Sequence, residues 1–310
     1  MFTLNKKIMR YGWYQLAFER ELSAELTPLR SALPLVALRT RKGVRVFDAV
    51  CPHRGAHLGF GGRADQDAII CPFHGYRIGI GTQCEEKSYR VREYSTLLIG
   101  GMLFACLSDK HEHGFRAMLQ DIDRDHFLVP GFSTDTNVQP DLVIENGFDS
   151  SHFRPVHTIQ NHPSFRILPS RAGEFSVEGT FLVPNSQWQT HGGEGLVSVP
   201  YTATSYGPGI ILSHMGGPDP YWVITCATPT SPGCCTIRLS IAVPASSAGD
   251  PPDEEKCAYL LKQSRQGIEK DALIWEHMTR IQPSHPAPED AAVLAFQKYL
   301  VDIESDGLEP

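Results

Sequence analysis

The sequence has no long apolar run. Its longest candidate extends from Leu97 to Cys106, and Gly100 and Gly101 interrupt it, whereas a helix that spans a bilayer needs about 18 or more consecutive apolar residues. The first ten residues carry two lysines and one arginine, but no apolar segment with a small-residue cleavage site follows them, which disfavours a secretory signal. We therefore expect a cytoplasmic protein with no membrane partner.

Basic residues are in deficit as well. The 310 residues include 28 Lys and Arg against 35 Asp and Glu, which gives a formal net charge of −7. A mild acidic surplus favours solubility and disfavours binding to a phosphate backbone, so we expect no nucleic-acid partner. The 41% hydrophobic and 20% charged residues are ordinary for a globular protein and disfavour disorder or a coiled coil. The length suggests two domains.

Cysteine is too scarce for a disulfide scaffold, since the chain has only eight. In a cytosolic protein, closely spaced Cys and His residues more often hold a metal or carry out chemistry. Two short segments combine them, namely Cys51-Pro52-His53-Arg54-Gly55 and Cys71-Pro72-Phe73-His74-Gly75. Their two thiolates and two imidazoles make a complete set of four metal ligands.

Two kinds of metal site fit this set. A structural zinc site usually pairs cysteines on one half and histidines on the other, whereas here each half mixes one Cys with one His. The mixture favours a [2Fe–2S] cluster of the Rieske kind, in which one iron takes both sulfurs and the other takes both imidazoles. The proline after each cysteine stiffens its loop, and Gly55 and Gly75 let the backbone approach a cluster closely.

Short β-rich runs flank these ligands. Residues 35–40 and 44–50 surround a turn at 41–43 and predict a hairpin, and residues 68–70 lead directly into Cys71. The runs predict a small all-β domain whose loops carry the ligands.

The composition changes after residue 108. His111 and His113 look like a metal pair, but their charged neighbours favour a solvated linker. Residues 118–126 then mix apolar and acidic side chains in a helical pattern. We place the boundary here and predict two domains, 1–118 and 119–310.

A second set of potential ligands lies in the run Glu145-Asn146-Gly147-Phe148-Asp149-Ser150-Ser151-His152-Phe153-Arg154-Pro155-Val156-His157. If residues 141–153 form a helix, Asp149 and His152 lie along one face. Pro155 then ends or kinks that helix, which lets His152 and His157 approach one ion from different directions. Two imidazoles and one carboxylate form the facial triad that binds Fe(II) and leaves positions open for O2 and substrate.

The carboxylate of this triad is expected far along the chain. Residues 258–280 show helical periodicity, so Asp271 can project towards the core. Glu269 and Glu276 are rival ligands, although both suit the exposed face of a salt-bridged helix. Asp271 is the candidate, with the two rivals left open.

Strand-like runs lie between the two ligand segments, at residues 175–183, 209–212, 221–225 and 236–243. Their spacing predicts an antiparallel sheet around the Asp271 helix, an arrangement that leaves an apolar funnel for a small molecule. The candidates to line it are Phe153, Val156, Phe165, Trp188, Tyr206, Met215 and Trp222. Core packing is the more common role for any one of them.

The order of these motifs resembles the oxygenase component of a Rieske non-haem iron oxygenase. It comprises C-P-H-R-G with C-P-F-H-G, then E-N-x2-D-x2-H-x4-H, then D-A-L-I-W-E. The last run, with Pro283, Asp290, Phe296 and Tyr299 after it, is most similar to the single-subunit monooxygenase branch that includes ketosteroid hydroxylases and cholesterol desaturases. One departure is Tyr76, where oxygenases of this type commonly carry Trp.

The resemblance implies a fold and a set of ligands. The expected fold is α+β, with an all-β Rieske domain followed by a catalytic domain of the helix-grip type, an antiparallel sheet around a long helix. The implied ligands are Cys51, His53, Cys71 and His74 for the [2Fe–2S] cluster and His152, His157 and Asp271 for a mononuclear Fe(II). Asp149 is implied as the link between the two metal centres.

The resemblance also implies a monooxygenase that hydroxylates, demethylates or desaturates a mostly apolar small molecule, with a steroid-like or polycyclic compound as the substrate class. Since the chain has no GxGxxG fingerprint and no second cluster motif, electrons must come from a separate NAD(P)H-dependent reductase, with or without a ferredoxin. In the family, the subunits form a head-to-tail homotrimer in which one cluster serves the neighbouring iron. Asp149 would then accept hydrogen bonds from His152 and from His74 of the partner subunit.

Two other functions stay open. An electron-transfer or binding protein would carry the cluster beside an inactive second domain, which the intact Asp149, His152, His157 and Asp271 disfavour. A structural zinc protein would have no redox role and no colour.

Overall fold

The computed structural model describes residues 12–22, 25–80, 89–107, 114–170, 173–185, 194–245, 251–279 and 285–306. His111, His113, Trp188 and Pro283, which the sequence singles out, lie outside the described residues. In the ranges given above, no helix is both long enough and apolar enough to cross a membrane.

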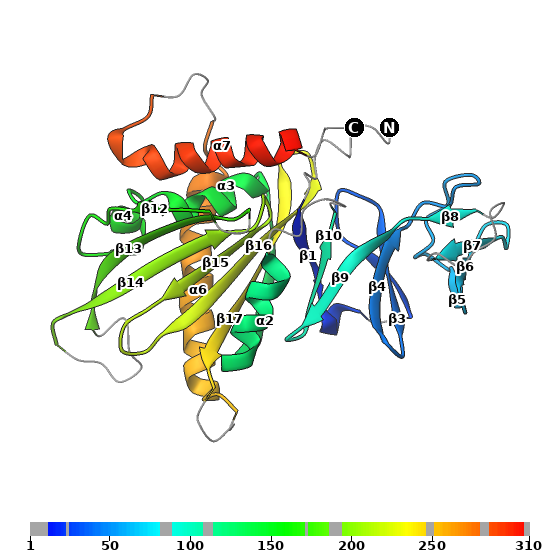
Figure 1. Ribbon diagram of the computed structural model, residues 1–310, viewed down its shortest axis with the longest axis horizontal. Coiled ribbons are helices and arrows are strands. Elements are labelled where there is room, and N and C mark those ends of the chain that lie inside the picture. The colour runs from blue at the N-terminus through cyan, green and yellow to red at the C-terminus, as the bar shows by residue number, and fades with distance from the viewer. Residues whose placement is uncertain are drawn as a thin grey trace.

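The first part of the chain folds as two small β-sheets (Figure 1). The described strands form one six-stranded sheet, in the order β1-β10-β9-β4-β3-β2, and one four-stranded sheet, in the order β5-β6-β7-β8. Their bounds are β1 Trp13–Phe18, β2 Leu26–Leu29, β3 Leu35–Thr40, β4 Gly43–Asp48, β5 Arg63–Asp65, β6 Ala68–Ile70, β7 Arg77–Ile80, β8 Arg90–Val91, β9 Glu93–Ile99 and β10 Met102–Cys106, with the short helix η1 Glu19–Glu21 after β1. The predicted hairpin is confirmed as β3 and β4, which pair antiparallel.

The rest of the chain wraps an antiparallel sheet around a long helix, as predicted (Figure 1). The described strand order is β11-β17-β16-β15-β14-β13-β12. The strands are β11 His126–Thr136, β12 Arg166–Leu168, β13 Phe175–Pro184, β14 Leu196–Ser205, β15 Ile210–Met215, β16 Tyr221–Ser231 and β17 Cys234–Pro244. The helices are α2 Phe115–Asp125, α3 Pro140–Glu145, η2 Asn146–Phe148, α4 Phe153–His157, α6 Glu254–Trp275, η3 Pro288–Asp290 and α7 Ala291–Asp306. Because α2 begins before residue 118, the predicted domain boundary falls inside this helix, and that boundary stays a prediction.

Helix α6 carries the candidate ligand Asp271. The Asp253 side chain accepts hydrogen bonds from the N–H groups of Glu255 and Lys256, which is a favourable N-cap. The buried residues of α6 are Cys257, Leu260, Asp271 and Trp275, and their spacing places them on one face of the helix. Asp271 is therefore held on the face that packs against the sheet, where an unpaired carboxylate is costly.

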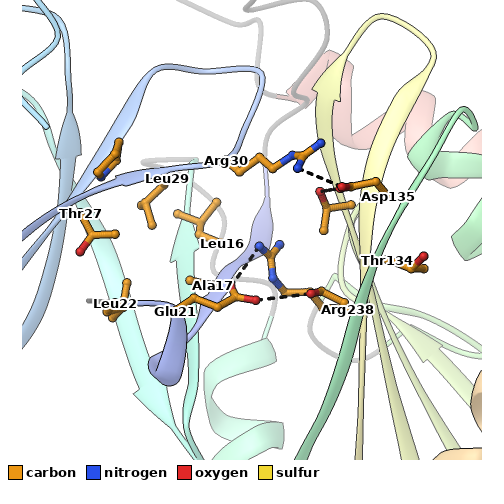
Figure 2. Close-up of a pocket in the computed structure, with 13 residues that line it drawn as sticks. Leu16, Ala17, Glu21, Leu22, Thr27, Leu29, Arg30, Thr134, Asp135 and Arg238 are labelled. Atoms are coloured by element: carbon orange, nitrogen blue, oxygen red, sulfur yellow. Dashed lines mark hydrogen bonds and ion pairs between the residues drawn. The ribbon is translucent and has the colours of Figure 1, made fainter. Parts of the chain in front are cut away.

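Two features join the two parts of the chain. Trp13, Phe18 and Phe104 of the first part pack in one apolar cluster with Phe115 of α2 and Ile210 of β15. Beside this cluster lies a polar cleft of about 480 Å³. Figure 2 shows two ion pairs that cross it, Arg30 with Asp135 at 2.9 Å and Arg238 with Glu21 at 3.3 Å. These contacts fix the orientation of the β-sheets of the first part relative to the sheet around α6.

The helix predicted over residues 141–153 is wrong in its length. Helix α3 ends at Glu145, η2 follows, and Asp149 has an extended backbone with φ −82° and ψ 102°. The Asp149 side chain accepts a hydrogen bond from the N–H of Ser151 at 2.8 Å, a local turn that competes with helix. A Cβ at Gly147 would come within 2.4 Å of the terminal methyl group of Ile211, so η2 packs closely on β15 and any larger residue would displace that side chain.

The predicted role of Pro155 is wrong too. It lies within α4 instead of ending a longer helix. The first turn of a helix tolerates proline because the missing N–H has no partner there. His152 precedes α4 and His157 ends it, so one short helical turn presents both imidazoles.

Candidate metal centres

The predicted cluster ligands lie on two loops that repeat one hydrogen-bonding pattern. In the first loop, the N–H of Cys51 donates to the carbonyl of Ala56 at 2.8 Å, and the N–H of Gly55 donates to the carbonyl of Cys51 at 2.9 Å. The second loop repeats both bonds from Cys71 and Gly75, at 2.9 and 3.0 Å. The two glycines have φ of 78° and 71°, a conformation that glycine adopts without strain. The motif therefore specifies the shape of the loops that carry the four predicted ligands.

The four side chains of these loops meet at the tip of the first part of the chain. The thiols of Cys51 and Cys71 are buried, with 2% and 1% exposure, and burial raises the pKa of Cys51, with the Cys71 thiol adding to the shift. The Nδ1 atoms of His53 and His74 are 3.2 Å apart, and His74 is exposed. A buried sulfur pair next to an outer nitrogen pair suits a cluster with one sulfur-ligated and one imidazole-ligated iron.

Aromatic rings surround the two histidines. The ring of Tyr76 lies 4.8 Å from that of His53, and the ring of Phe73 lies 3.8 Å from that of His74. Phe73 and Tyr76 are 60% and 46% exposed. Tyr76 thus lies beside the predicted cluster ligands, and both rings are open to contact from outside the chain.

The predicted ligands of the second centre also come together. One ligand atom from each of His152, His157 and Asp271 lies within 4.8 Å of the other two. The Nε2 atom of His157 is 3.1 Å from Oδ1 of Asp271. Glu269 and Glu276, the rival carboxylates, are exposed, whereas Asp271 is buried at 6% exposure. The geometry therefore favours Asp271, and its role as an iron ligand stays a prediction.

Asn146, to which no role is assigned from the sequence, adjoins this centre. Its Nδ2 atom is 3.1 Å from Nε2 of His152 and 3.1 Å from Oδ2 of Asp271. An amide NH2 group only donates, so this contact requires a lone pair on the His152 nitrogen. The position of Asn146 in the E-N-x2-D run is a signal, but nothing in the spacing indicates that η2 turns its side chain towards Asp271.

The environment of His152 favours the neutral imidazole that binds metals. Burial and the neighbouring His157 lower the pKa of His152. Its Nδ1 atom donates to the carbonyl of Asp149 at 2.7 Å, which leaves a lone pair on Nε2, where a metal would take the place of the hydrogen bond from Asn146. Both interactions select the same tautomer, so the donor set fits a ferrous ion held by two imidazoles and a carboxylate.

Asp149 differs from the prediction in one detail. The expectation that its carboxylate accepts the hydrogen bond of His152 is wrong, since the acceptor is the backbone carbonyl and Oδ2 lies 3.7 Å from Nδ1 of His152. The carboxylate is 33% exposed and lines an outer cavity together with His152 and Asp271. It therefore stays accessible to a donor that approaches from outside the chain.

A second, inner cavity of about 240 Å³ opens on the other side of His152, His157 and Asp271. Its walls come from the sheet and from α6. Most of the lining side chains are apolar, and the polar ones include Ser213, Thr225, Gln263 and Ser264. An apolar cavity with a few polar groups next to a metal centre is the usual form of a small-molecule site.

The predicted lining residues are only partly right. Phe153 and Met215 line the inner cavity, and Val156 lines the outer one. Phe165 instead stacks on Tyr201, with ring centroids 5.4 Å apart. The other two described candidates, Tyr206 and Trp222, belong to the apolar cluster shared by the two parts of the chain.

The two candidate centres of one chain lie far apart. The loops that carry the cysteines are next to β5–β8, at one end of the long axis of the molecule, and α4 lies towards the other end (Figure 1). Within one chain, the cluster position and the triad therefore do not face each other.

Comparison with known proteins covers nearly the whole chain. Residues 12–95 match the Rieske [2Fe–2S] domain, and residues 115–298 match the family described as the 3-ketosteroid 9α-hydroxylase C-terminal domain. The chain is 24% identical to cholesterol 7-desaturase nvd of Xenopus laevis over 335 residues, which cover 95% of this chain and 72% of that protein. It is 23% identical to the oxygenase component of 3-ketosteroid-9-alpha-monooxygenase of Rhodococcus rhodochrous over 295 residues, covering 84% and 72%.

Solved structures share the fold. Dicamba monooxygenase bound to 3,6-dichlorosalicylic acid superposes with a TM-score of 0.71 at 18% identity, covering 96% of this chain and 97% of that one. NdmA of Pseudomonas putida CBB5 with caffeine gives a TM-score of 0.71 at 16% identity, covering 97% and 92%.

Proposed function

The chain belongs to the family of the 3-ketosteroid 9α-hydroxylase C-terminal domain and is a Rieske oxygenase, and we propose that it uses O2 to hydroxylate, demethylate or desaturate a mostly apolar small molecule. The family resemblance, the enzyme class and the pair of iron cofactors that the sequence predicts are confirmed by these matches. The observation that carries the proposal is the opening of the apolar inner cavity onto His152, His157 and Asp271.

When bound, the cluster supplies electrons and the ferrous ion activates O2. The residues of the chain hold the two iron cofactors and orient the substrate. We assign the cluster to Cys51, His53, Cys71 and His74, and the ferrous ion to His152, His157 and Asp271. The apolar walls exclude water and leave the substrate next to the triad, which favours reaction by proximity.

The substrate class follows from the cavity and from the relatives. Side chains such as Phe181, Ile211 and Leu239 offer apolar contacts, and Ser213 and Thr225 offer hydrogen bonds at defined places. The names of two relatives contain cholesterol and 3-ketosteroid, which supports a steroid-like or polycyclic compound. An apolar ring system with a polar substituent fits both observations.

We propose that the working form is a head-to-tail homotrimer. The two centres of one chain lie towards opposite ends (Figure 1), so electrons need a second chain to bring a cluster near the triad. The exposed Phe73 and Tyr76 beside the cluster position complement the outer cavity, which Ile274 and Met278, at 46% and 51% exposure, help to line. In this arrangement Asp149 accepts a hydrogen bond from His74 of the partner subunit. A heterologous contact of this kind closes into a ring.

The electron source is proposed to be a separate NAD(P)H-dependent reductase, with or without a ferredoxin. The relative from Rhodococcus rhodochrous is named an oxygenase component, which supports a system of several proteins. A cytosolic location stays a prediction.

The test starts from protein purified without oxygen. We expect three irons and two acid-labile sulfides per chain, following from one [2Fe–2S] cluster plus one mononuclear iron, and a Rieske-type paramagnetic signal after dithionite. Turnover with NADH and a generic reductase is then measured on steroids, aromatic compounds and alkaloids by mass spectrometry. A product that has gained one oxygen, lost two hydrogens or lost a methyl group supports the proposal. Two irons per chain and no product would instead support an electron carrier, and colourless zinc protein would overturn the proposal entirely.

A further inference from the structure

Gly267 lies in the interior of α6, one helical turn before Asp271. Glycine is the least favourable residue in a helix interior apart from proline, because it loses the most backbone freedom. The helix itself therefore gains nothing from glycine at this position, and a reason has to come from its surroundings.

Packing does not require glycine here either. A Cβ at Gly267 would meet only the imidazole of His157, at 3.8 and 3.9 Å, which is ordinary van der Waals contact. Gly147 is different, since a Cβ there would approach Ile211 to 2.4 Å. Alanine would fit at position 267 without moving the helix or the ligand, so neither the backbone nor the packing explains the glycine.

The missing side chain leaves space in the inner cavity. Gly267 lines that cavity together with Ser264, Ile268 and His157, and it lies on the same side of α6 as Asp271 because the two are four residues apart. The cavity measures about 240 Å³, below the range of roughly 300–1,000 Å³ for drug-sized ligands, so it holds part of a steroid-like compound and leaves the rest of the molecule outside. One added side chain would therefore occupy a large share of the room beside the triad.

We propose that Gly267 determines which substrates reach the iron, because any longer side chain at this position would extend past the ring of His157 into the inner cavity, which takes the edge of an apolar ring compound. The residue at this position sets the greatest width that the site accepts. This inference rests on the proposed function, since it concerns the substrate of the same site. Glycine at this position lowers the stability of the helix and, in this proposal, serves substrate specificity. Trade-offs of this kind between stability and activity are common in proteins.

The test compares Gly267→Ala with Gly267→Leu. Alanine and leucine are both strong helix formers, so the pair separates the effect of side-chain volume from that of helix propensity. Gln266→Ala and Gln266→Leu are the matched controls, because Gln266 is the exposed neighbour on the same helix. Binding of indole, naphthalene, phenanthrene and progesterone to the iron-loaded proteins is measured without oxygen by calorimetry, together with iron content and melting temperature.

We expect Gly267→Ala to raise the melting temperature by about 2 °C. It should also weaken the binding of the widest probe that the wild type binds and leave the binding of indole unchanged. Gly267→Leu should weaken the binding of every probe that is wider than indole and that the wild type binds by at least about 10-fold, since leucine adds four carbons and a misfit of one methylene in an apolar pocket already costs about 10- to 200-fold. The two Gln266 variants should bind all probes as the wild type does.

Three results would overturn the proposal: unchanged binding in Gly267→Leu, a lower melting temperature in Gly267→Ala, or no binding of any probe to the wild type. If Gly267→Leu loses iron through contact with His157, the alanine variant decides, since its Cβ makes only ordinary contact. The experiment distinguishes a failure of the Gly267 proposal from a failure of the proposed oxygenase function. Size-dependent binding without any product would leave the width limit standing and remove the oxygenase function, whereas equal turnover by all variants would do the reverse.

Discussion

Arg238 and Glu21 form an ion pair in the cleft of Figure 2. We predict that removing one partner destabilises the protein more than removing the other. The Arg238 side chain is 4% exposed and that of Glu21 is 34% exposed. Burial lowers the pKa of Arg238, and the charge of Glu21 opposes that shift. Because the cation is the buried partner, removing Glu21 should harm the protein more than removing Arg238.

The magnitudes follow from this difference in burial. Leaving a fully buried charge without its partner costs about 3–5 kcal/mol, and the exposure of Glu21 reduces this to about 2 kcal/mol for Glu21→Gln. The carbonyl of Gln15 still accepts from Arg238 at 3.2 Å, which holds the guanidinium in place. Arg238→Met removes the buried charge and leaves a carboxylate that water can reach, so we expect a loss of about 1 kcal/mol or less.

Urea denaturation followed by circular dichroism measures both variants, with equal m-values as the condition for comparing them. The double variant Glu21→Gln with Arg238→Met is the control, and it should be more stable than Glu21→Gln alone because no buried charge is left. If Arg238→Met is the more damaging single change, the buried-cation reasoning is refuted.

Three further variants test the second centre. Asp271→Ala should lower the iron content by one per chain while the cluster keeps its visible spectrum, and an unchanged iron content would exclude Asp271 as a ligand. Asp149→Ala should keep both metals and abolish turnover, since the proposed contact with the cluster of the neighbouring subunit is lost. Full activity would show that Asp149 is not needed for electron transfer between the two centres. Tyr201→Phe should reduce the free energy of unfolding by about 1–2 kcal/mol, because its hydroxyl donates to the carbonyl of Gly147 at 2.9 Å, and unchanged stability in urea would show that this bond contributes nothing.

The cluster end of the chain was predictable because its information is local. Each loop places a cysteine, a proline, a histidine and a glycine within five residues, and the glycine closes the same hydrogen-bonded turn in both loops. The β-runs beside the loops have the alternation and turn residues of a hairpin. No long-range packing has to be known to place the ligands.

For the second centre, the sequence predicts which residues come together but not which of their atoms form hydrogen bonds. The sequence identifies His152, His157 and Asp271, and the structure brings them together. It does not reveal that Asp149 holds His152 through its carbonyl, or that Asn146 contacts both His152 and Asp271. These details depend on the break in the helix after Glu145, where Gly147 packs closely on β15 and the Asp149 side chain forms a local turn.

Substrate choice was the least predictable property, since the cavity is made by elements far apart in the sequence. A pattern of large apolar residues marks a core as readily as a cavity wall, which is why Phe165 and Tyr206 were plausible candidates and pack elsewhere. The residue that matters most in our proposal has no side chain at all. A glycine inside a helical pattern looks only like a weak point of the helix, and its meaning appears when the atom it lacks is placed 3.8 Å from His157. In our proposal, specificity in this site is set by the absence of a side chain at Gly267, next to the predicted ligands His157 and Asp271.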